Sequence, residues 1–271
     1  MISSIIDKAR VLGATIQRIP TACGHHCELI KFNNEKYTLY IPDDVTHLNK
    51  TQGAIDIRFS SNLPRIIGTL NVLGGQSLKS TAYMFSKCSI QYINLTGLCT
   101  KNVEIMQGMF FDCSTCSIEM GAFDTSNVTD MSWMFSDMWL QSDGELNLNF
   151  NTQNVTDMQG MFSKALFEGT SESGHKRCDL DLSSFDTRNV RTMDEMFSGL
   201  AIKSLNISSF DTRNVTSFNK MFYRLKIDAT LNVENITAEN GASTTKMFTA
   251  SKLNGGLEIS NELARVAITQ I

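Results

Sequence analysis

The chain has 271 residues, of which 42% are hydrophobic and 19% are charged, and its formal net charge at pH 7 is −4. This hydrophobic content is enough for a substantial buried core, so the composition excludes a disordered chain. The mildly acidic balance lacks the basic excess that neutralising phosphates requires, and we expect no direct binding to nucleic acid.

Neither a secretory signal nor a membrane span is visible in the sequence. Asp7, Lys8 and Arg10 interrupt residues 1–13, where a signal peptide needs an apolar run. No later stretch approaches the roughly 18 apolar residues of a membrane span. We therefore expect a cytoplasmic protein without membrane contact, at the surface or secreted only if a leader was removed. The seven cysteines are an odd number in a chain too long to need disulfides, which predicts mostly reduced thiols.

Residues 1–75 do not follow the repeat found in the rest of the chain. Ile2–Ile16 has helical periodicity, and Glu28–Phe32 and Tyr37–Ile41, separated by four polar residues, are typical of a β-hairpin. The first coil of a repeat stack would otherwise expose an apolar end and an unpaired strand edge. We therefore expect residues 1–75 to form a helix-hairpin cap. The alternative is a cap that also carries a binding surface of its own.

Four potential zinc ligands lie together in this segment, namely Cys23, His25, His26 and Cys27. Their spacing lacks the usual two-residue gap, and no second ligand pair follows at a zinc-finger distance. We interpret residues 23–27 as a turn, keep a metal site as the weaker alternative, and expect no cofactor. None of the four histidines lies in a recognisable catalytic motif, so we do not expect an enzyme.

From residue 84 onward the dipeptide Met-Phe recurs at nearly constant spacing. Its methionines are Met84, Met109, Met134, Met161, Met196, Met221 and Met247, at intervals of 25, 25, 27, 35, 25 and 26 residues. The longest interval contains a polar insertion between Leu166 and Cys178, which we expect to be a flexible loop projecting from the stack. A unit of this length cannot bury its own apolar face. We therefore predict a solenoid of about seven repeats over residues 76–260, followed by a C-terminal cap segment at 261–271.

Each repeat combines a strand pattern with the spacing of a short helix. Val128, Met131, Met134 and Phe135 fall at positions i, i+3, i+6 and i+7, which places them on one side of a helix. Alternating apolar pairs that precede this segment are typical of half-buried strands: Ile118/Met120, Leu146/Leu148, Leu180/Leu182, Leu205/Ile207 and Leu231/Val233. We expect each coil to run from strand through turn to short helix.

An asparagine stands seven residues before the methionine of the Met-Phe pair in five repeats: Asn102, Asn127, Asn154, Asn189 and Asn214. An asparagine at a turn can bond to backbone groups that are left unpaired there. One such residue per coil would form a ladder that ties neighbouring coils together. We favour this structural role over a role in binding a ligand.

Cys113 and Cys116 have the spacing of a redox or zinc motif. The repeat alignment argues against that role, because it places Cys113 in an apolar column where a thiol acts as a small hydrophobic group. The other members of this column are Cys88, Met138, Ala165, Leu200 and Leu225.

Residues Phe123–Phe135 read Phe-Asp-Thr-Ser-Asn-Val-Thr-Asp-Met-Ser-Trp-Met-Phe. This string resembles the repeat of the BspA-like leucine-rich-repeat proteins, and the resemblance extends over about Gln76–Ser260. It implies a protein of a bacterium or mobile element, often displayed on a surface to bind host or matrix proteins. Together with the residue pattern it predicts an α/β fold: a leucine-rich-repeat-like right-handed solenoid, with a parallel sheet on one face, short helices on the other, and an N-terminal α+β cap.

One outward-facing residue lies between the two buried residues of each predicted strand. Stacking would align these residues in a column: Asn94, Glu119, Asn147, Asp181, Asn206, Asn232 and Glu258. A flanking column would contain Tyr92, Ser117, Glu145, Asp179, Ser204 and Thr230. The central column carries amides and carboxylates without lysine or arginine, so we expect a protein partner with a basic or amide-rich surface. A merely solvated sheet face is the alternative.

A less regular candidate surface comprises Trp133, Trp139 and Phe111, which stand where other repeats carry small or polar residues. They have the character of interface anchors. The alternative is that they pack beneath the insertion at residues 166–178.

These patterns predict a non-catalytic protein-binding repeat module, either a monomer or a weak end-to-end dimer. An alternative is an intracellular inhibitor, encoded by a phage or mobile element, that occupies a basic groove of a host nucleic-acid enzyme. A third interpretation is a metal-dependent enzyme that uses residues 23–27.

Overall fold

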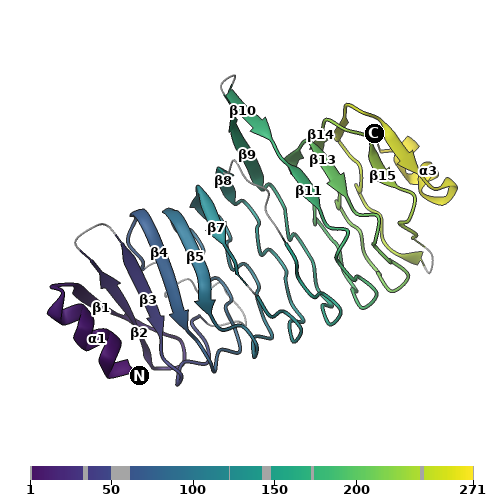
Figure 1. Cartoon of the computed structure of the whole chain (residues 1–271). Coiled ribbons are helices and arrows are strands. Elements are labelled where there is room, and N and C mark those ends of the chain that lie inside the picture. The colour runs from purple at the N-terminus through teal and green to yellow at the C-terminus, as the bar shows by residue number, and fades with distance from the viewer. Residues whose placement is uncertain are drawn as a thin grey trace.

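Short strands from successive repeats stack along one axis and form an elongated solenoid in the computed structural model of the chain (Figure 1). The structure describes residues 2–32, 36–49, 62–121, 123–141, 148–171, 174–238 and 241–270. The two termini lie at opposite ends of the stack (Figure 1). The predicted repeat solenoid with parallel strand pairing is therefore confirmed.

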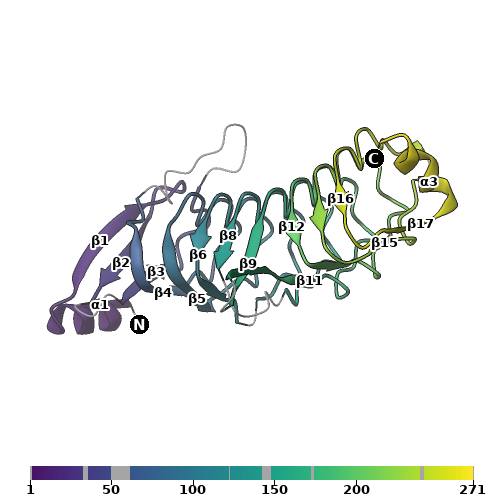
Figure 2. The same cartoon turned by 90° about the horizontal axis from the view of Figure 1, so that it is seen from above.

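Two lines of strands run along the solenoid (Figure 2). The first line starts with a sheet in the order β1 (Thr15–Pro20), β2 (His26–Lys31), β3 (Tyr37–Ile41), β4 (Ile66–Gly74), β5 (Ile90–Leu98) and β7 (Ser117–Glu119). Later coils continue it with the parallel pairs β11 (Asp179–Asp181) with β13 (Ser204–Asn206), and β15 (Leu231–Val233) with β17 (Leu257–Ile259). We call this line the long sheet.

The second line of strands lies around a corner from the long sheet, and in coils that carry both, its strand comes first in the chain. Its members, in spatial order, are β6 (Ser114–Thr115), β8 (Trp139–Gln141), β9 (Leu166–Ser171), β12 (Ala201–Ile202), β14 (Lys226–Ile227) and β16 (Lys252–Leu253). A single residue, Cys116, separates β6 from β7, so the two lines meet at a sharp edge. We call this line the short sheet.

The segments that carry the Met-Phe pairs are turns, so the prediction of short helices on the other face is wrong. Around Met134, alternate amides bond three residues back, with Met134, Ser136 and Met138 donating to Met131, Trp133 and Phe135 at 3.3, 3.1 and 3.3 Å. The amides between them donate to the next coil, with Trp133, Phe135 and Asp137 bonding Gln159, Met161 and Ser163 at 2.8, 2.9 and 2.7 Å. Trp133 and Asp137 also have positive φ angles of 58° and 53°, which a right-handed helix excludes.

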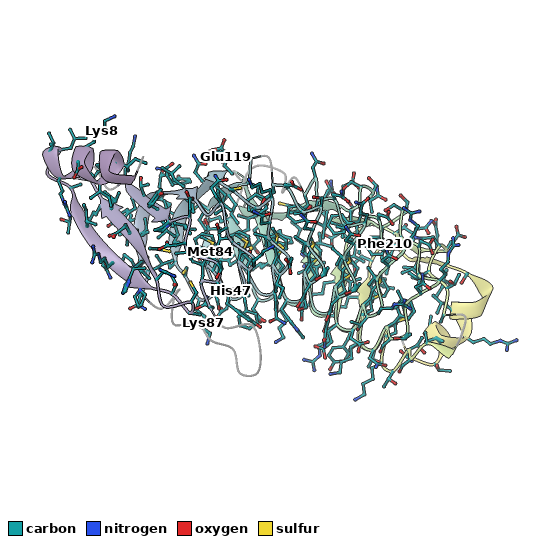
Figure 3. All side chains as sticks on the ribbon, turned by 90° about the horizontal axis from the view of Figure 1, so that it is seen from below. Lys8, His47, Met84, Lys87, Glu119 and Phe210 are labelled. Carbon is teal, nitrogen blue, oxygen red and sulfur yellow. The ribbon has the colours of Figure 1, made fainter. Side chains whose placement is uncertain are left out.

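Buried apolar side chains fill the interior of the coils along the length of the solenoid (Figure 3). One phenylalanine from each Met-Phe pair joins a continuous stack, in which neighbouring ring centroids lie 5.4 to 5.9 Å apart: Phe85, Phe110, Phe135, Phe162, Phe197, Phe222 and Phe248. All these rings are fully buried. Stacked aromatic pairs contribute beyond their burial, so this column is a main source of cohesion between coils.

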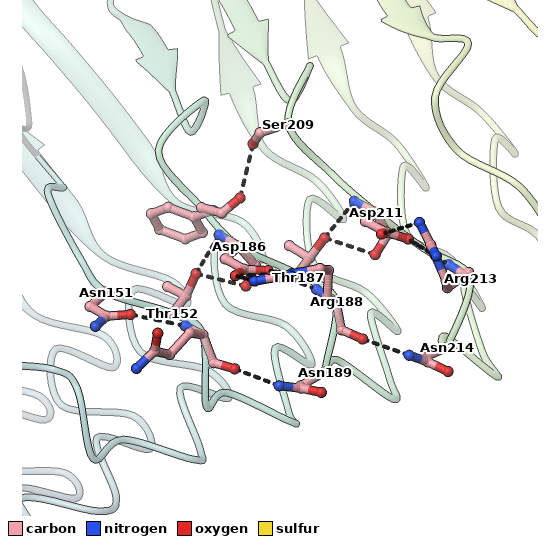
Figure 4. Close-up of polar contacts among 12 residues, drawn as sticks. Asn151, Thr152, Asp186, Thr187, Arg188, Asn189, Ser209, Asp211, Arg213 and Asn214 are labelled. Carbon is pink, nitrogen blue, oxygen red and sulfur yellow. Dashed lines mark hydrogen bonds and ion pairs between the residues drawn. The ribbon is translucent and has the colours of Figure 1, made fainter.

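The predicted asparagine ladder is confirmed (Figure 4). In each case the side-chain amide donates to a backbone carbonyl of the preceding coil. The pairs are Asn102 with Gln76, Asn127 with Lys101, Asn154 with Ser126, Asn189 with Gln153 and Asn214 with Arg188, at 2.7 to 2.8 Å. The asparagines therefore satisfy turn carbonyls and fix the stacking of coils.

A second ladder, made by threonines two residues before the asparagines, was not predicted from the sequence. The Thr187 hydroxyl donates to the Asp211 carbonyl at 2.9 Å and accepts from the Asp211 amide at 2.8 Å (Figure 4). Thr152 makes the same pair of bonds with Asp186, at 2.9 and 2.7 Å. These threonines are buried. Each hydroxyl therefore acts as donor and acceptor across one coil boundary.

At the N-terminal end, helix α1 (Ile2–Val11) precedes three antiparallel strands. The predicted hairpin is present as β2 and β3, which pair antiparallel, whereas residues 33–35 at its turn lie outside the described residues. Strand β3 then pairs parallel with β4 from Tyr37 to Ile41. The long sheet is thus continuous from this segment into the repeats.

The insertion after Leu166 is a hairpin, which corrects the prediction of a loop. Strand β9 pairs antiparallel with β10 (Gly174–Arg177), and the hairpin projects from the middle of the stack (Figure 1). Backbone pairing explains the difference, because β9 is itself a member of the short sheet and extends outward beyond the coil.

At the C-terminal end, helix α3 (Asn261–Ile268) packs on the last coil, where its Leu263 and Ala267 are buried. Gln270 beyond the helix donates to the Thr244 carbonyl at 3.1 Å and accepts from the Phe248 amide at 3.2 Å. Among the residues that the structure describes, no helix has the length and apolar character needed to span a bilayer.

Candidate functional site

Strand register aligns the outward-facing residues of the long sheet that the repeat pattern singled out. Three groups are in direct register: Asn71, Asn94 and Glu119; Asp181 and Asn206; Asn232 and Glu258. We call these residues the outward column. Asn147 and Glu145, two further predicted members of this surface, lie outside the described residues. Asn71 was missed because its strand precedes the recognisable repeats.

The flanking residues are aligned in the same way. Tyr92 pairs with Thr69 on one side and Ser117 on the other, and Asp179 pairs with Ser204. The predicted register is therefore present within each of these strand pairs, whereas Ser204 lies in the pair of β11 with β13 and Thr230 precedes the separate pair of β15 with β17.

Four members of the outward column accept a hydrogen bond from the backbone amide two residues later, and two of them, Asp181 and Asn206, are the last residues of their strands. The side-chain oxygen of Asn94 accepts from the Thr96 amide at 3.0 Å, and that of Asp181 accepts from the Ser183 amide at 2.9 Å. Asn206 and Asn232 make equivalent bonds to the residues two positions later, at 3.2 and 3.0 Å. The amides and carboxylates of this column are therefore explained in part by turn formation. Bonds from Ser183 lower the pKa of Asp181 below its ordinary value and keep it charged.

Basic residues beside the column neutralise part of the negative charge of this surface. Lys203 Nζ lies 2.8 Å from Asp179 Oδ2, and Arg177 lies 2.8 Å from Asp228 Oδ1. The expected acidity of the flanking column is thus largely offset at Asp179. Glu119 and Glu258 are exposed and carry the remaining charge of the outward column together with Asp181.

A hollow of about 350 Å³ lies beside the C-terminal part of the outward column. Its lining includes Asn206, Asn232, Glu234 and Asn235. Neutral amides dominate this lining, so it can offer both donors and acceptors to a partner.

A second hollow of about 250 Å³ lies where the two lines of strands meet, in the N-terminal half of the solenoid. We call it the corner groove. It is lined by Arg65, Ile66, Ile67, Ser89, Ile90, Gln91, Ser114, Thr115, Cys116, Trp139 and Gln141. Ile67 and Trp139 are 65% and 44% exposed, and Tyr92, next to Gln91, is also 44% exposed. Large apolar side chains that are exposed together around one groove are typical of interaction sites.

The three aromatic residues proposed as a second surface do not form one site. Trp133 lies in a turn and packs over Gly160 of the next coil, where an added Cβ would meet its ring at 2.2 Å. Phe111 contacts Tyr83 edge to face, with centroids 6.3 Å apart. Trp139 instead belongs to β8 and lines the corner groove. Since Trp139 remains exposed, it is not covered by the hairpin that follows it.

The cysteines and histidines of residues 23–27 have different surroundings in the structure. His25 Nδ1 lies 2.9 Å from Asp44 Oδ2, and Cys23 Sγ lies 3.2 Å from the Thr21 hydroxyl. Cys27 is fully buried in β2. Within the described ranges, no three side chains of His, Cys, Asp or Glu come together in a way that could hold a metal ion. The zinc alternative for Cys23, His25, His26 and Cys27 therefore gains no support.

Cys23 differs from the buried cysteines in its ionisation. Partial burial raises the pKa of Cys23, but bonds from the Thr21 hydroxyl and from the backbone amides of His47, Thr46 and His25 outweigh it and lower that pKa to about 7. Burial raises the pKa of Cys88 to about 12 and that of Cys113 well above its ordinary value. Cys113 therefore belongs to the core, as its apolar repeat column predicted.

A family model described as "Mycoplasma protein of unknown function, DUF285" matches residues 79–173 and 149–261. These overlapping matches span more than half of the chain and coincide with its repeats. The chain belongs to this family. No curated protein and no solved structure matches it.

Most of both candidate surfaces lies within the part that the DUF285 model matches. The outward column from Asn94 to Glu258 lies inside residues 79–261, as do Gln91, Ser114 and Trp139 of the corner groove. Arg65 and Ile67 precede the match and close the groove at its N-terminal end. The groove is thus built jointly by repeats of the family and by the strand before them.

Proposed function

We propose that this chain is a non-catalytic repeat module of the BspA-like leucine-rich-repeat type that binds a protein partner on the outward face of its long sheet. Residues 1–75 and 261–271 serve as caps on the repeats at 76–260. The observation that carries the proposal is the register of the outward column. Because parallel strands are spaced by about 4.8 Å, this register repeats a polar side chain at even intervals within each of the three groups of the column.

The chemistry of the column favours a partner surface rich in amides or basic groups. Glu119, Asp181 and Glu258 supply carboxylates, and the asparagines between them supply amides that donate and accept. A row of such groups along the long sheet suits recognition of an extended protein surface. The hollow beside Asn206 and Asn232 gives this face a depression into which a side chain of the partner can fit.

A charge variant tests the proposal. Glu119→Lys, Asp181→Asn and Glu258→Lys together remove the acidic charge, and Asn at 181 keeps the oxygen that bonds to Ser183. A control variant carries Glu104→Lys, Asp112→Asn and Glu195→Lys, which change the net charge by the same amount. These residues lie in or beside the turns that carry the Met-Phe pairs, and we call this the turn side of the coils. Both variants must keep the circular dichroism spectrum of the wild type.

The readout is cross-linked affinity capture from extracts of host and producing cells, followed by mass spectrometry. We expect the proteins captured by wild type and control to be lost from the column variant. Recovery of surface or matrix proteins then supports adhesion, and recovery of a nuclease or polymerase supports the inhibitor alternative. Equal capture by all three proteins contradicts binding at the long sheet.

A further inference from the structure

The corner groove is shaped by differences in side-chain size between neighbouring coils. Strand register defines two rows of lining residues on either side of the buried Ile66, Ile90, Thr115 and Leu140. In the first row the serines Ser89 and Ser114 lie between Arg65 and Trp139, and in the second row Gln91 and Cys116 lie between Ile67 and Gln141. Large side chains at both ends, with the small Ser89, Ser114 and Cys116 between them, leave the hollow, and Gln91 is the one larger side chain in the middle.

The dimensions of the groove suit a small rigid unit. Three strand spacings separate the outer strands, which places their backbones about 14 Å apart. The volume of about 250 Å³ is shared between the two rows. This space accommodates one or two six-membered rings with their substituents, and it is too short for a folded element.

The strands in the middle of the groove offer no free backbone edge to a ligand. Strand β6 pairs with β8, and Ser114 of β6 bridges to Ser89 on its other side. Strand β8 pairs with β9, and the Ile66 amide donates to the Ser89 carbonyl at 3.0 Å. Because β5, β6 and β8 are paired on both sides at this level, an extended peptide cannot join the sheet between them. Recognition must use side chains.

The side chains combine one aromatic surface with neutral polar groups. Trp139 presents its ring from one end and Ile67 adds an apolar contact at the other. Among the described lining residues, Arg65 is the one charged group. Gln91, Gln141, Ser89 and Ser114 supply amides and hydroxyls that both donate and accept. The matching ligand therefore has a flat C–H face, a rim of hydroxyl groups and no net charge. A pyranose ring has these features.

We infer that the corner groove is a binding site for a neutral oligosaccharide, with a pyranose ring stacked on Trp139 and its hydroxyls bonded by the glutamines, serines and Arg65. The site differs from the outward column and does not depend on protein binding there. Trp139 is the residue on which the sugar stacks. Its indole ring is partly exposed, so the apolar face of a sugar can replace the water on it at little cost in free energy.

Calorimetric titration and tryptophan fluorescence with cellohexaose, maltohexaose, chitohexaose and mannohexaose test the inference. We expect at least one of these oligosaccharides to bind wild type with a dissociation constant in the millimolar range or below. Trp139→Ala should weaken that binding about tenfold or more, and Ser114→Trp, which fills the groove, should do the same. Lys226→Ala is the control. Lys226 is exposed on β14, in the same row across the short sheet as Trp139, and its loss should leave the affinity for the oligosaccharide unchanged.

Protection of Cys116 gives a readout that does not depend on tryptophan. The bound oligosaccharide should slow alkylation of Cys116 by N-ethylmaleimide and leave alkylation of the half-buried Cys99 unchanged. Absence of binding by all four oligosaccharides, or equal binding by wild type and Trp139→Ala, overturns the inference. The variant of Glu119, Asp181 and Glu258 should still bind the oligosaccharide, so failure of this site and failure of the protein-binding face are separable.

Discussion

The side-chain amide of Asn189 donates a hydrogen bond to the backbone carbonyl of Gln153, 2.7 Å away in the preceding coil. Equivalent bonds at four other coil boundaries make this contact a general device for stacking. The device explains why an asparagine recurs in the repeat without requiring a ligand.

Loss of one rung of this ladder should destabilise the solenoid modestly. Asn189→Ala removes the donor and leaves the Gln153 carbonyl without its partner, which should cost about 1 kcal/mol in the free energy of unfolding. Gln153→Ala keeps the backbone carbonyl and should have little effect. Urea unfolding followed by circular dichroism measures both. A loss from Gln153→Ala as large as that from Asn189→Ala contradicts the account.

Substitutions at Lys246 distinguish a turn from a helix. Lys246 is exposed and has a φ angle of 55°, a left-handed conformation that glycine adopts without strain and β-branched residues adopt poorly. Lys246→Gly should therefore be neutral or stabilising, and Lys246→Val should destabilise by about 1 kcal/mol or more. In a short helix the order would reverse, because glycine costs about 1 kcal/mol in a helix interior. Thermal unfolding of the two variants decides between these cases.

Neutralising Asp157 should raise the stability of the protein, and neutralising Asp124 should lower it. Burial, followed by the nearby Asp130 and Asp194, raises the pKa of Asp157 despite its bond from Gln159, so its charged form costs stability above that pKa. Bonds from Ser126 lower the pKa of Asp124, so its charged form adds stability that is lost as the pH falls through the lowered pKa.

At pH 7, Asp157→Asn should therefore raise the melting temperature and Asp124→Asn should lower it. Asparagine keeps the side-chain oxygen that accepts from the backbone in both places. Near pH 3 both carboxyls are increasingly protonated, so both differences should shrink. Scanning calorimetry at the two pH values provides the measurement. The same sign of change for both variants at pH 7 would falsify the assignment.

Cys23 should ionise far more readily than the buried cysteines Cys88 and Cys113. Since its pKa is lowered to about 7, the rate of its alkylation by iodoacetamide should reach half its maximum near that pH. Thr21→Val removes the hydroxyl at 3.2 Å and should move this midpoint upward. Cys88, with a pKa of about 12, should remain unreacted over the same range. A midpoint above about 8.5 for wild-type Cys23 would exclude the proposed stabilisation of its thiolate.

Periodicity predicted the parts of this fold that every coil shares. The Phe stack, the Asn ladder and the register of Asp181 with Asn206 follow directly from spacing, because stacked coils bring equivalent residues together. Residue spacing predicted the wrong backbone conformation for the Met-Phe segments. Val128, Met131 and Phe135 recur as they would in a helix, but the choice between helix and turns depends on amides that bond to the next coil.

The corner groove lay beyond prediction from repeat spacing. It needs Arg65 and Ile67 from the non-repeating segment beside Trp139 of β8, and only the register across four coils places them at one hollow. The hairpin of β9 and β10 was missed for a similar reason, since its polar composition suits a loop as well as an exposed antiparallel pair.

Site-specific photocross-linking tests the central claim that the outward face of the long sheet binds a protein. A photoreactive phenylalanine replaces Glu119 on that face, or Glu104 on the turn side, in otherwise identical proteins exposed to cell extract. The account predicts that a discrete cross-linked protein forms from position 119 and is absent from position 104. The same product from both positions, or a product from position 104 alone, would contradict it.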